Sequence, residues 1–574
     1  MNGALALAAS IAAMDRAELG ELLAARDVQA PQEIRDPLAL AIELLRGDSV
    51  AAAVRTTDRS GLEALLLVQE GPPGEASGPA AADPAALSRV RRLGLVGLDT
   101  GRDEPVALPE VSEILSDSDL SALRRERGRG IDRDGHEPEG RPQDASWFGA
   151  ALTAVGQASG LLRALSSRSA RLSRRGALTV SAGRDLAQSI HDEAAPVGLL
   201  VDLLRALGLV APFPGYQSAD YLGTTAAAAG WLDLPHPERW SALAAALLDE
   251  LPPELSRTLG LLAAERRPAG HGSAEPPLGL GGIDLGAVVR DLLPEEFPLL
   301  PEASLRRAEA WADAAELLGI AVGGVLAPPA TPLLAGDVEG ALRIASRDFP
   351  DPATGLYLQP DLSIIVPGPL APADERWLHT IADTEQLGVA MTLRLSAPSL
   401  TRSLRAGERV DALRARLERL SLTGIPQPLD YLLGDLARKQ LAGTLQAAQD
   451  HRFGHPPAAD PIVRIAATAE AVDAGAAAES ADDGTHGRAP SPEIDALIER
   501  LLAAAEGTGD LSRRLELAIR DRSPVRVTAS AGPDERTFLL LPVALTGSRL
   551  RATDQQAGVQ RTLPLSAIVA VEAA

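Results

Sequence analysis

Apolar residues recur at intervals of three and four along much of the chain, which places them on one face of an α-helix. The spacing is clear over residues 15–25, 38–46 and 59–68, and small apolar residues fill positions 1–14. No lysine or arginine precedes that first run, as a signal peptide would require, so we expect a first helix there. The pattern predicts an N-terminal helical domain over residues 1–70.

Segments rich in glycine, proline and charge interrupt this pattern and mark the boundaries between units. The predicted interruptions are a linker at 71–84, a flexible linker at 124–145, a loop at 269–285 and an acidic linker at 474–492. Between them, the pattern predicts a small winged-helix-like unit at 85–123 and a helical connector at 286–350. These boundaries give a multidomain chain.

Residues 146–268 predict a winged-helix-like domain, because a helix, a turn, a second helix and a turn-rich tail follow one another. Residues 176–187 lead into one helix, and Asp192 and Pro196 open the next over residues 197–207. That second helix would read DNA, yet Arg205 is its only basic residue, whereas groove-reading helices usually present several polar or basic side chains. A protein contact or a purely structural role is therefore the alternative to DNA reading.

The most strand-rich internal segment, residues 355–370, contains two apolar runs separated by Gln359-Pro360-Asp361. Proline cannot donate a hydrogen bond to a strand ladder, so we expect this tripeptide to bend an edge strand. The side chains of Gln359 and Asp361 would then satisfy nearby backbone donors. A helix over 376–385 and a strand over 391–395 should follow, and Ser396 is the expected N-cap of the next helix.

The final unit, residues 493–574, begins with helices up to Arg520 and then changes to the composition of strands. The strands are expected at 525–529, 537–543, 550–553 and 563–571. Together with the preceding segments, this predicts a mainly helical α+β fold.

Composition narrows the classes of function. The chain has 574 residues, no cysteine and a net charge of −23, so it has no disulfide, no thiol nucleophile and no cysteine-ligated zinc. This fits a cytoplasmic protein, and no apolar run reaches the length of a membrane span, so no membrane partner is expected. Two islands remain basic: residues 149–183 contain five arginines and no acid, and residues 401–420 contain six arginines and three acids. These islands either contact phosphates or form solvent-exposed helix faces on which the arginines pair with nearby carboxylates.

Motifs for catalysis are missing from the sequence. A P-loop needs Gly-Lys-Ser/Thr, but Lys439 is the only lysine and follows an arginine. The Gly-x-Ser-x-Gly elbow of many hydrolases is also absent. His451 and His455 are close in sequence, but Gly454 and the prolines after His455 oppose the helix that a metal pair would need. We therefore expect no enzyme activity, no catalytic residues, no metal and no cofactor.

Residues 351–450 resemble the helicase-associated domain that precedes the motor in bacterial XPB-type helicases. The resemblance rests on Gln359-Pro360-Asp361, on Leu-Arg-Leu running into Ser396-x-x-Ser399, and on Ile425-Pro-Gln-Pro428 before an acidic helix. The N-terminal residues 22–31 are similar to the corresponding region of motor-less actinobacterial proteins that carry this domain. The resemblance implies DNA and an XPB-type helicase as partners, in DNA repair or transcription.

The last 65 or so residues resemble a WYL module, a small Sm-like β-barrel found in bacterial regulators. The shared features are residues 515–519, Pro542, Gly547 and Arg561. The sequence differs from the family at the Trp-Tyr-Leu motif that gives the family its name, because residues 548–550 are Ser-Arg-Leu. Ligand binding would fall to Arg561, with Arg549 and Arg551 as substitutes.

The sequence thus favours a non-enzymatic, helicase-associated accessory protein. A WYL-type transcriptional regulator that senses a nucleotide or nucleic-acid ligand and a protein-interaction scaffold with little DNA contact are the alternatives. The oligomeric state stays open. The nucleic-acid-binding residues that we expect are Arg402, Arg405, Arg409, Arg414, Arg416 and Arg419, together with Arg171, Arg174 and Arg175.

Overall fold

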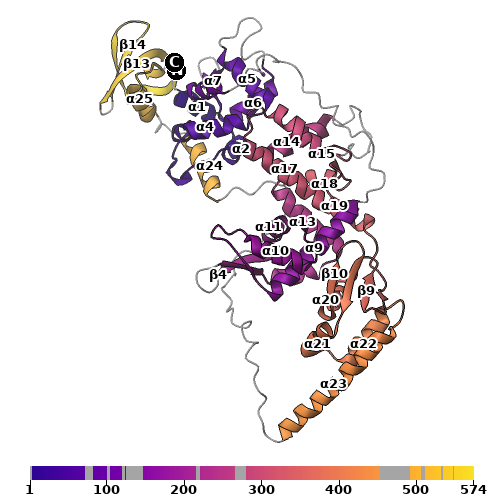
Figure 1. Ribbon diagram of the computed structural model, residues 1–574. Helices are drawn as coiled ribbons and strands as arrows, with labels where there is room; N and C mark the ends of the chain where they lie inside the picture. Colours follow the sequence, from indigo (N-terminus) through magenta and orange to yellow (C-terminus); the bar gives the residue numbers. More distant parts are fainter. Residues whose placement is uncertain are drawn as a thin grey trace. The chain divides into compact units, whose positions relative to one another are not determined.

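The structure is a computed structural model in which the chain forms two compact units (Figure 1). It describes residues 3–70, 82–99, 104–118, 120, 123, 147–214, 220–265, 280–452, 492–505, 511–531, 534–546 and 549–573. The flexible linker predicted at 124–145, His455 and nearly all of the other predicted linkers lie outside these residues. Unit 1 comprises residues 1–135, 288–307 and 487–574, and unit 2 comprises residues 136–287 and 308–486. Among the described residues, no helix is long and apolar enough to cross a membrane.

The N-terminal part of unit 1 is helical over residues 3–70, and a strand hairpin flanked by two further helices follows. Side chains cap several of these helices: Asp15 and Glu18 form a reciprocal capping box, and Asp36 and Asp58 accept from backbone N–H groups of the first turn. The elements are α1 (Gly3–Ala12), α2 (Arg16–Ala25), α3 (Pro37–Leu44), α4 (Gly47–Arg55), α5 (Arg59–Gln69), α6 (Pro84–Arg92), the hairpin β1 (Val96–Asp99) and β2 (Glu104–Ala107), and α7 (Pro109–Asp117). A short 3-10 turn, η1 (Pro31–Glu33), precedes α3.

The C-terminal part of unit 1 contains two helices and a five-stranded antiparallel sheet of order β15-β14-β13-β12-β16. Its elements are α24 (Pro492–Ala505), α25 (Leu511–Arg520), β12 (Val525–Ala531), β13 (Asp534–Thr546), β14 (Arg549–Asp554), β15 (Gln560–Pro564) and β16 (Ile568–Ala573). The single strand expected at 563–571 is wrong, because a 3-10 turn, η7 (Leu565–Ala567), divides it after Pro564. β16 then pairs with β12 rather than with β15, so the described strands do not close into the predicted barrel.

The two ends of the chain share one hydrophobic core in unit 1, where α24 lies beside the N-terminal helix α2 (Figure 1). Leu497 of α24 is fully buried with residues of α1 to α3, and the Arg500 guanidinium donates to the carbonyl oxygens of Pro31 at 2.7 Å and Ile34 at 3.3 Å. Arg526 of β12 pairs with Asp99 of β1 at 3.3 Å. A π-helical turn, η5 (Val288–Leu292), and α16 (Leu293–Glu296) complete the unit.

Unit 2 begins with helices around a three-stranded antiparallel sheet of order β3-β5-β4. The elements are α9 (Trp147–Ser167), β3 (Ala170–Arg171), α10 (Val180–Ser189), α11 (Val197–Ala206), β4 (Val210–Pro214), β5 (Asp220–Thr224), α12 (Ala227–Leu232), α13 (His236–Asp249) and α14 (Pro253–Glu265). Ala170 and Leu222 lie opposite each other and are both buried, so this face of the sheet covers the core.

The connecting segment contains α15 (Leu285–Ala287), α17 (Glu302–Leu317), β6 (Ala321–Val322), β7 (Val325–Leu326), α18 (Ala330–Leu334) and α19 (Val338–Asp348). The predicted helical connector also contains a short strand hairpin. Gly323 and Gly324 both adopt positive φ, at 58° and 81°, and close the β6–β7 hairpin between α17 and α18. Trp240 and Trp311 donate from their indoles to the Leu318 and Leu247 carbonyls, at 2.8 and 2.9 Å, and so join α13 to α17.

The last part of unit 2 is a four-stranded antiparallel sheet of order β10-β11-β9-β8 with four helices. Its elements are β8 (Tyr357–Leu358), β9 (Ser363–Val366), α20 (Pro372–Ile381), β10 (Ala382–Gln386), β11 (Met391–Leu395), α21 (Ala397–Arg405), α22 (Val410–Leu420) and α23 (Gln427–Arg452). The helix expected at 376–385 is wrong after Ile381, because residues 382–386 pair with β11 instead. Ser396 caps α21 as predicted, in a reciprocal box with Ser399.

The Gln359-Pro360-Asp361 tripeptide forms the turn between β8 and the next strand of the sheet. The Gln359 N–H donates to the Ser363 carbonyl at 2.9 Å, and the Ser363 N–H donates to Oδ1 of Asp361 at 3.0 Å. Arg394 also donates to the Asp361 carbonyl at 3.0 Å. The Asp361 side chain satisfies a backbone donor as expected, but the tripeptide turns the chain from the edge strand β8 into β9 and does not bend a single strand.

Candidate functional site

The arginines of α21 and α22 lie on the surface of unit 2, and most of them face a carboxylate. Arg402 pairs with Asp383 at 2.6 Å, Arg409 with Asp411 at 3.7 Å, and Arg414 with Asp430 and, at 3.9 Å, with Glu418. Arg416 and Arg419 share Asp374 at 2.9 and 3.0 Å. Arg405, exposed in the last turn of α21, makes no ion pair within the described part of the chain. This group is therefore mainly a set of ion pairs on a helical surface.

Arg416 is the most strongly held member of this group. Its guanidinium lies 4.5 Å from the centroid of the Trp377 ring and donates to the Ala373 carbonyl at 2.9 Å. Burial opposes ionisation of Asp374, but the hydrogen bonds and charges of Arg416 and Arg419 outweigh it, and the pKa of Asp374 is lowered. Arg416 therefore serves to attach α22 to α20.

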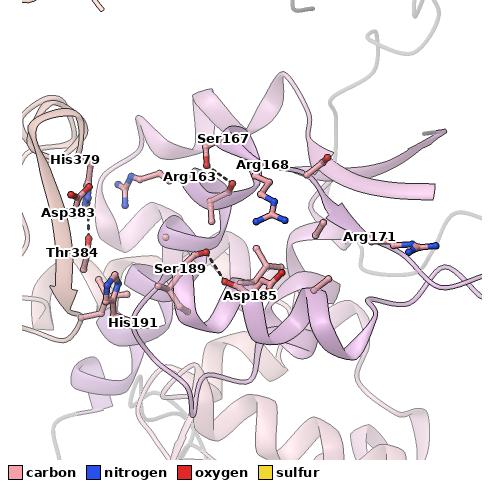
Figure 2. A pocket seen from close by; sticks show the side chains of 18 of the residues that line it. Arg163, Ser167, Arg168, Arg171, Asp185, Ser189, His191, His379, Asp383 and Thr384 are labelled. Atoms are coloured by element: carbon pink, nitrogen blue, oxygen red, sulfur yellow. Dashed lines mark hydrogen bonds between the residues drawn. The ribbon is translucent and has the colours of Figure 1, made fainter. Parts of the chain in front are cut away.

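A cleft of about 1070 Å³ lies between α9, β3 and α10 on one side and β10 and α21 on the other (Figure 2). Figure 2 shows His379, Asp383 and Thr384 at one end, with Arg168 near the middle and Arg171 toward the other end. Its charged lining consists of Arg163, Arg168, Arg171 and Arg402 against Asp185 and Asp383. We call this hollow the unit 2 cleft.

The arginines from the first basic island differ from those of α21 and α22. Arg168 and Arg171 line the unit 2 cleft and are exposed, and neither forms an ion pair with a carboxylate among the residues that the structure describes. Arg174 and Arg175 lie on the turn after β3, where the Ser173 N–H donates to the Ala177 carbonyl at 2.7 Å. Both are exposed, and neither forms an ion pair with a described carboxylate. These four guanidiniums are open to an external anion.

One end of the cleft rests on a buried ion-pair network. Glu375 of α20 accepts from Arg163 of α9 at 2.7 Å and lies 2.9 Å from Arg239 of α13. Burial alone would raise the pKa of Glu375, but Arg163, Arg239 and His236 reverse this and lower it to about 2. Burial lowers the pKa of His236 to about 4 and that of His379 to about 3. The network fixes one wall of the cleft and keeps both imidazoles neutral near pH 7.

Helix α11, the expected recognition helix, does not present a basic surface. The Arg205 guanidinium donates to the Gly176 carbonyl at 3.2 Å and lies 4.0 Å from Asp202. It therefore secures the turn between β3 and α10.

The three arginines expected in a WYL-type ligand site are separated by the strand alternation. Arg561 donates to Asp554 at 2.6 Å and lies 4.7 Å from the centroid of the Phe538 ring. Asp554 belongs to the buried face of β14, whereas Arg549 and Arg551 alternate onto its exposed face. The structure thus leaves Arg561 apart from the other two.

Sequence reasoning did not identify the partners across the cleft. Glu375 is 212 residues from Arg163, and Asp383 and His379 lie in a segment that was expected to be a continuous helix. The absence of acids over residues 149–183 was the one signal that pointed to the cleft.

Comparison with known proteins adds one finding. Residues 356–453 match the family of helicase conserved C-terminal domains. The match covers the four-stranded sheet and helices α20 to α23, and it includes Glu375, Asp383 and Arg402 but not Arg168 or Arg171. No curated protein matches the chain.

Proposed function

We propose that the chain is a non-enzymatic, helicase-associated accessory protein that binds nucleic acid through the exposed arginines of unit 2. The helicase-type domain at residues 356–453 supports the first half of this proposal. The missing P-loop lysine supports the absence of a motor within this chain. The helix order around α10 and α11, with the β4–β5 hairpin, fits a winged-helix fold for the segment that carries these arginines.

The observation that supports nucleic-acid binding is that some arginines of unit 2 form ion pairs with carboxylates and others do not. Arg168, Arg171, Arg174 and Arg175 make no ion pair with any described carboxylate, although the whole chain carries a net charge of −23. An acidic chain would be expected to neutralise such a cluster with its own acids, as it does on α21 and α22. Free guanidiniums can neutralise phosphates and release their counterions. Arg405 and Arg409 would extend this surface, whereas Arg414, Arg416 and Arg419 mainly serve the fold.

The test is a fluorescence titration with labelled single-stranded and duplex DNA at several salt concentrations. The intact protein is compared with the double variant Arg168→Ala/Arg171→Ala. Loss of two phosphate contacts should weaken binding and reduce the slope of log K against log salt by about 1.5. Arg343→Ala, which removes an exposed arginine of α19 outside the cleft, is the matched control and should leave the slope unchanged.

Two results would contradict the proposal. The first is a dissociation constant weaker than about 100 μM for every nucleic acid at low salt, where phosphate binding is strongest. The second is equal loss of affinity in the cleft variant and in Arg343→Ala. ATP hydrolysis by the pure protein, well above background, would instead contradict its assignment as a non-enzyme.

Partnership with an XPB-type helicase is the part of the proposal that rests on resemblance. A pull-down of such a helicase by the intact chain, with and without nuclease treatment, distinguishes two forms of it. Retention after nuclease treatment supports direct docking, and so the scaffold alternative, while retention only with DNA supports a shared nucleic acid. No retention in either case removes the partnership.

A nucleotide-sensing role for the C-terminal sheet is the second candidate function. Arg561 is the residue on which it depends, yet Asp554 and the Phe538 ring already hold that guanidinium. Arg561→Ala should abolish any nucleotide-dependent thermal shift if this sheet binds nucleotides. The absence of a shift in the intact protein would leave the sheet with a structural role, fixing the C-terminal segment to the N-terminal helices.

A further inference from the structure

The sheet beside the unit 2 cleft carries a row of three side chains on its outer face. Arg171 of β3 lies opposite Tyr221 of β5, and Tyr221 lies opposite Phe213 of β4. Opposite residues in antiparallel strands project from the same face, with Cβ atoms about 4.5–5.5 Å apart. Successive side chains of a strand point to opposite faces of the sheet. Leu222, which follows Tyr221, is buried in the core, so Arg171, Tyr221 and Phe213 lie on the outer face. We call it the aromatic row.

The two rings of the aromatic row are held in a defined arrangement. The centroids of Phe213 and Tyr221 are 6.3 Å apart, with an interplanar angle of 27°, and Phe213 is 43% exposed. The Phe213 ring lies over Gly223: a Cβ at that position would come within 2.7 Å of the ring. Glycine at 223 thus lets the phenyl ring lie close against β5. Aromatic residues make up only 3% of the chain.

The aromatic row continues into the unit 2 cleft. Tyr221 and Arg171 both line the cleft, and so does Arg168, which precedes β3. The surface therefore combines aromatic faces with guanidiniums that no described carboxylate neutralises. A ligand that fits this surface needs flat rings to stack on the aromatic side chains and negative charges, a few ångströms from those rings, to pair with the guanidiniums. Unpaired nucleotides have this chemistry, whereas a duplex keeps its base faces stacked inside the helix.

We propose that the aromatic row binds single-stranded nucleic acid, with nucleobases stacked on Phe213 and Tyr221 and the neighbouring phosphates held by Arg171 and Arg168. This inference rests on the proposed function, since it requires that the cleft bind nucleic acid, and it specifies the unpaired strand as the ligand. We expect the aromatic row to bind without sequence preference, because every base has a face that can stack on an aromatic ring.

The test compares wild-type protein with Phe213→Leu/Tyr221→Leu in titrations with oligothymidylate, oligouridylate, a duplex and an abasic oligonucleotide of equal length. The variant should bind either single strand about ten- to a hundredfold more weakly, as expected for the loss of one or two stacked bases. Duplex binding should change less than about twofold. Wild type should bind the abasic strand about as weakly as the variant binds oligothymidylate. The two homopolymers distinguish DNA from RNA as the preferred strand.

Two further variants test whether any loss of affinity is due to the aromatic row itself. Tyr431→Leu removes a tyrosine that is 70% exposed on α23, away from the cleft, and should leave all affinities unchanged. Gly223→Val keeps both rings but displaces Phe213, and it should weaken single-strand binding in the same direction as the double variant.

The outcomes separate this inference from the proposed function. If Phe213→Leu/Tyr221→Leu binds single strands like wild type while Arg168→Ala/Arg171→Ala still weakens binding, the aromatic row is overturned and the phosphate-binding cleft stands. Equal affinity of wild type for the abasic strand and for oligothymidylate also overturns it. If wild type binds no nucleic acid, both proposals fall.

Discussion

The Arg163 guanidinium lies 2.7 Å from the Glu375 carboxylate, although 212 residues separate them in the chain. The side chain of Glu375 is only 7% exposed, and that of its second partner, Arg239, is fully buried. One carboxylate therefore contacts two guanidiniums and joins α20, inside the segment that matches helicase C-terminal domains, to α9 and α13, outside it. The wall of the unit 2 cleft depends on this junction.

Glu375→Gln should destabilise unit 2 strongly. Glutamine keeps the shape and one acceptor, but Arg163 and Arg239 would lose the charge that compensates their burial, at a cost of about 3–5 kcal/mol. All five tryptophans lie in unit 2, so urea denaturation followed by tryptophan fluorescence reports on this unit alone. Glu418→Gln, at an exposed ion pair of α22, is the control and should shift the midpoint little. Equal midpoints for the two variants would contradict the role of the junction.

The stability of unit 2 should fall as the pH drops from about 6.5 toward 4. The pKa values of His236 and His379 are lowered to about 4 and 3, so the unfolded chain takes up protons in this range while the folded chain does not. Glu375, with its pKa lowered to about 2, adds a loss only below about 4.5, where its unfolded form protonates. Thermal melts followed by tryptophan fluorescence should show the decline, and His379→Asn should make it shallower. A melting temperature that stays constant between pH 6.5 and 4.5 would argue against buried neutral imidazoles.

Gly319→Ala should destabilise the contact between α17 and the start of α9. Gly319 has φ of 70°, and a Cβ there would overlap the Trp147 carbonyl oxygen. The matched variant is Gly323→Ala, which has φ of 58° but no atom within 4 Å of the new Cβ. Gly323→Ala should cost about 1–2 kcal/mol from its backbone conformation alone, and Gly319→Ala should cost clearly more. Urea midpoints that rank the two variants in the opposite order would disprove the close approach.

Leu497→Ala should loosen the N-terminal helices of unit 1. Leu497 is fully buried against them, and its truncation should cost about 2–5 kcal/mol. Hydrogen exchange read out by mass spectrometry should show faster exchange in α2 and α3, far from the substitution in sequence. Glu499→Ala removes an exposed partner of Arg16 on the same helix and should have little effect. Unchanged protection of α2 and α3 in Leu497→Ala would show that α24 does not support them.

Much of the local structure could be predicted from the sequence. Asp15 and Ser396 were readable as helix starts or caps because capping needs only a side-chain oxygen and the backbone of the next turn. The turn at Asp361 was readable for the same reason, since its hydrogen bonds stay within two residues. The similarity of residues 356–453 to helicase C-terminal domains could be anticipated because its motifs lie in one continuous stretch.

The candidate site could be predicted only in part. The run of arginines without acids at residues 149–183 was visible, but the pairing of each arginine was not. Arg416 and Arg168 look equivalent in sequence, yet Asp374 and Trp377 hold the former, while the latter faces the cleft without a described carboxylate. An ion pair depends on distances between elements, which periodicity does not encode.

The sequence by itself therefore determined where several helices begin, which tripeptide interrupts the two strands around residues 355–370, and that the chain has no P-loop lysine. These properties depend on interactions within a few residues or on residue identity alone. The tertiary structure alone decided that Glu375 meets Arg163, and that Phe213 and Tyr221 stack beside Arg171. Burial and strand register create both relationships, because they bring together side chains whose separation along the chain carries no information about their contact.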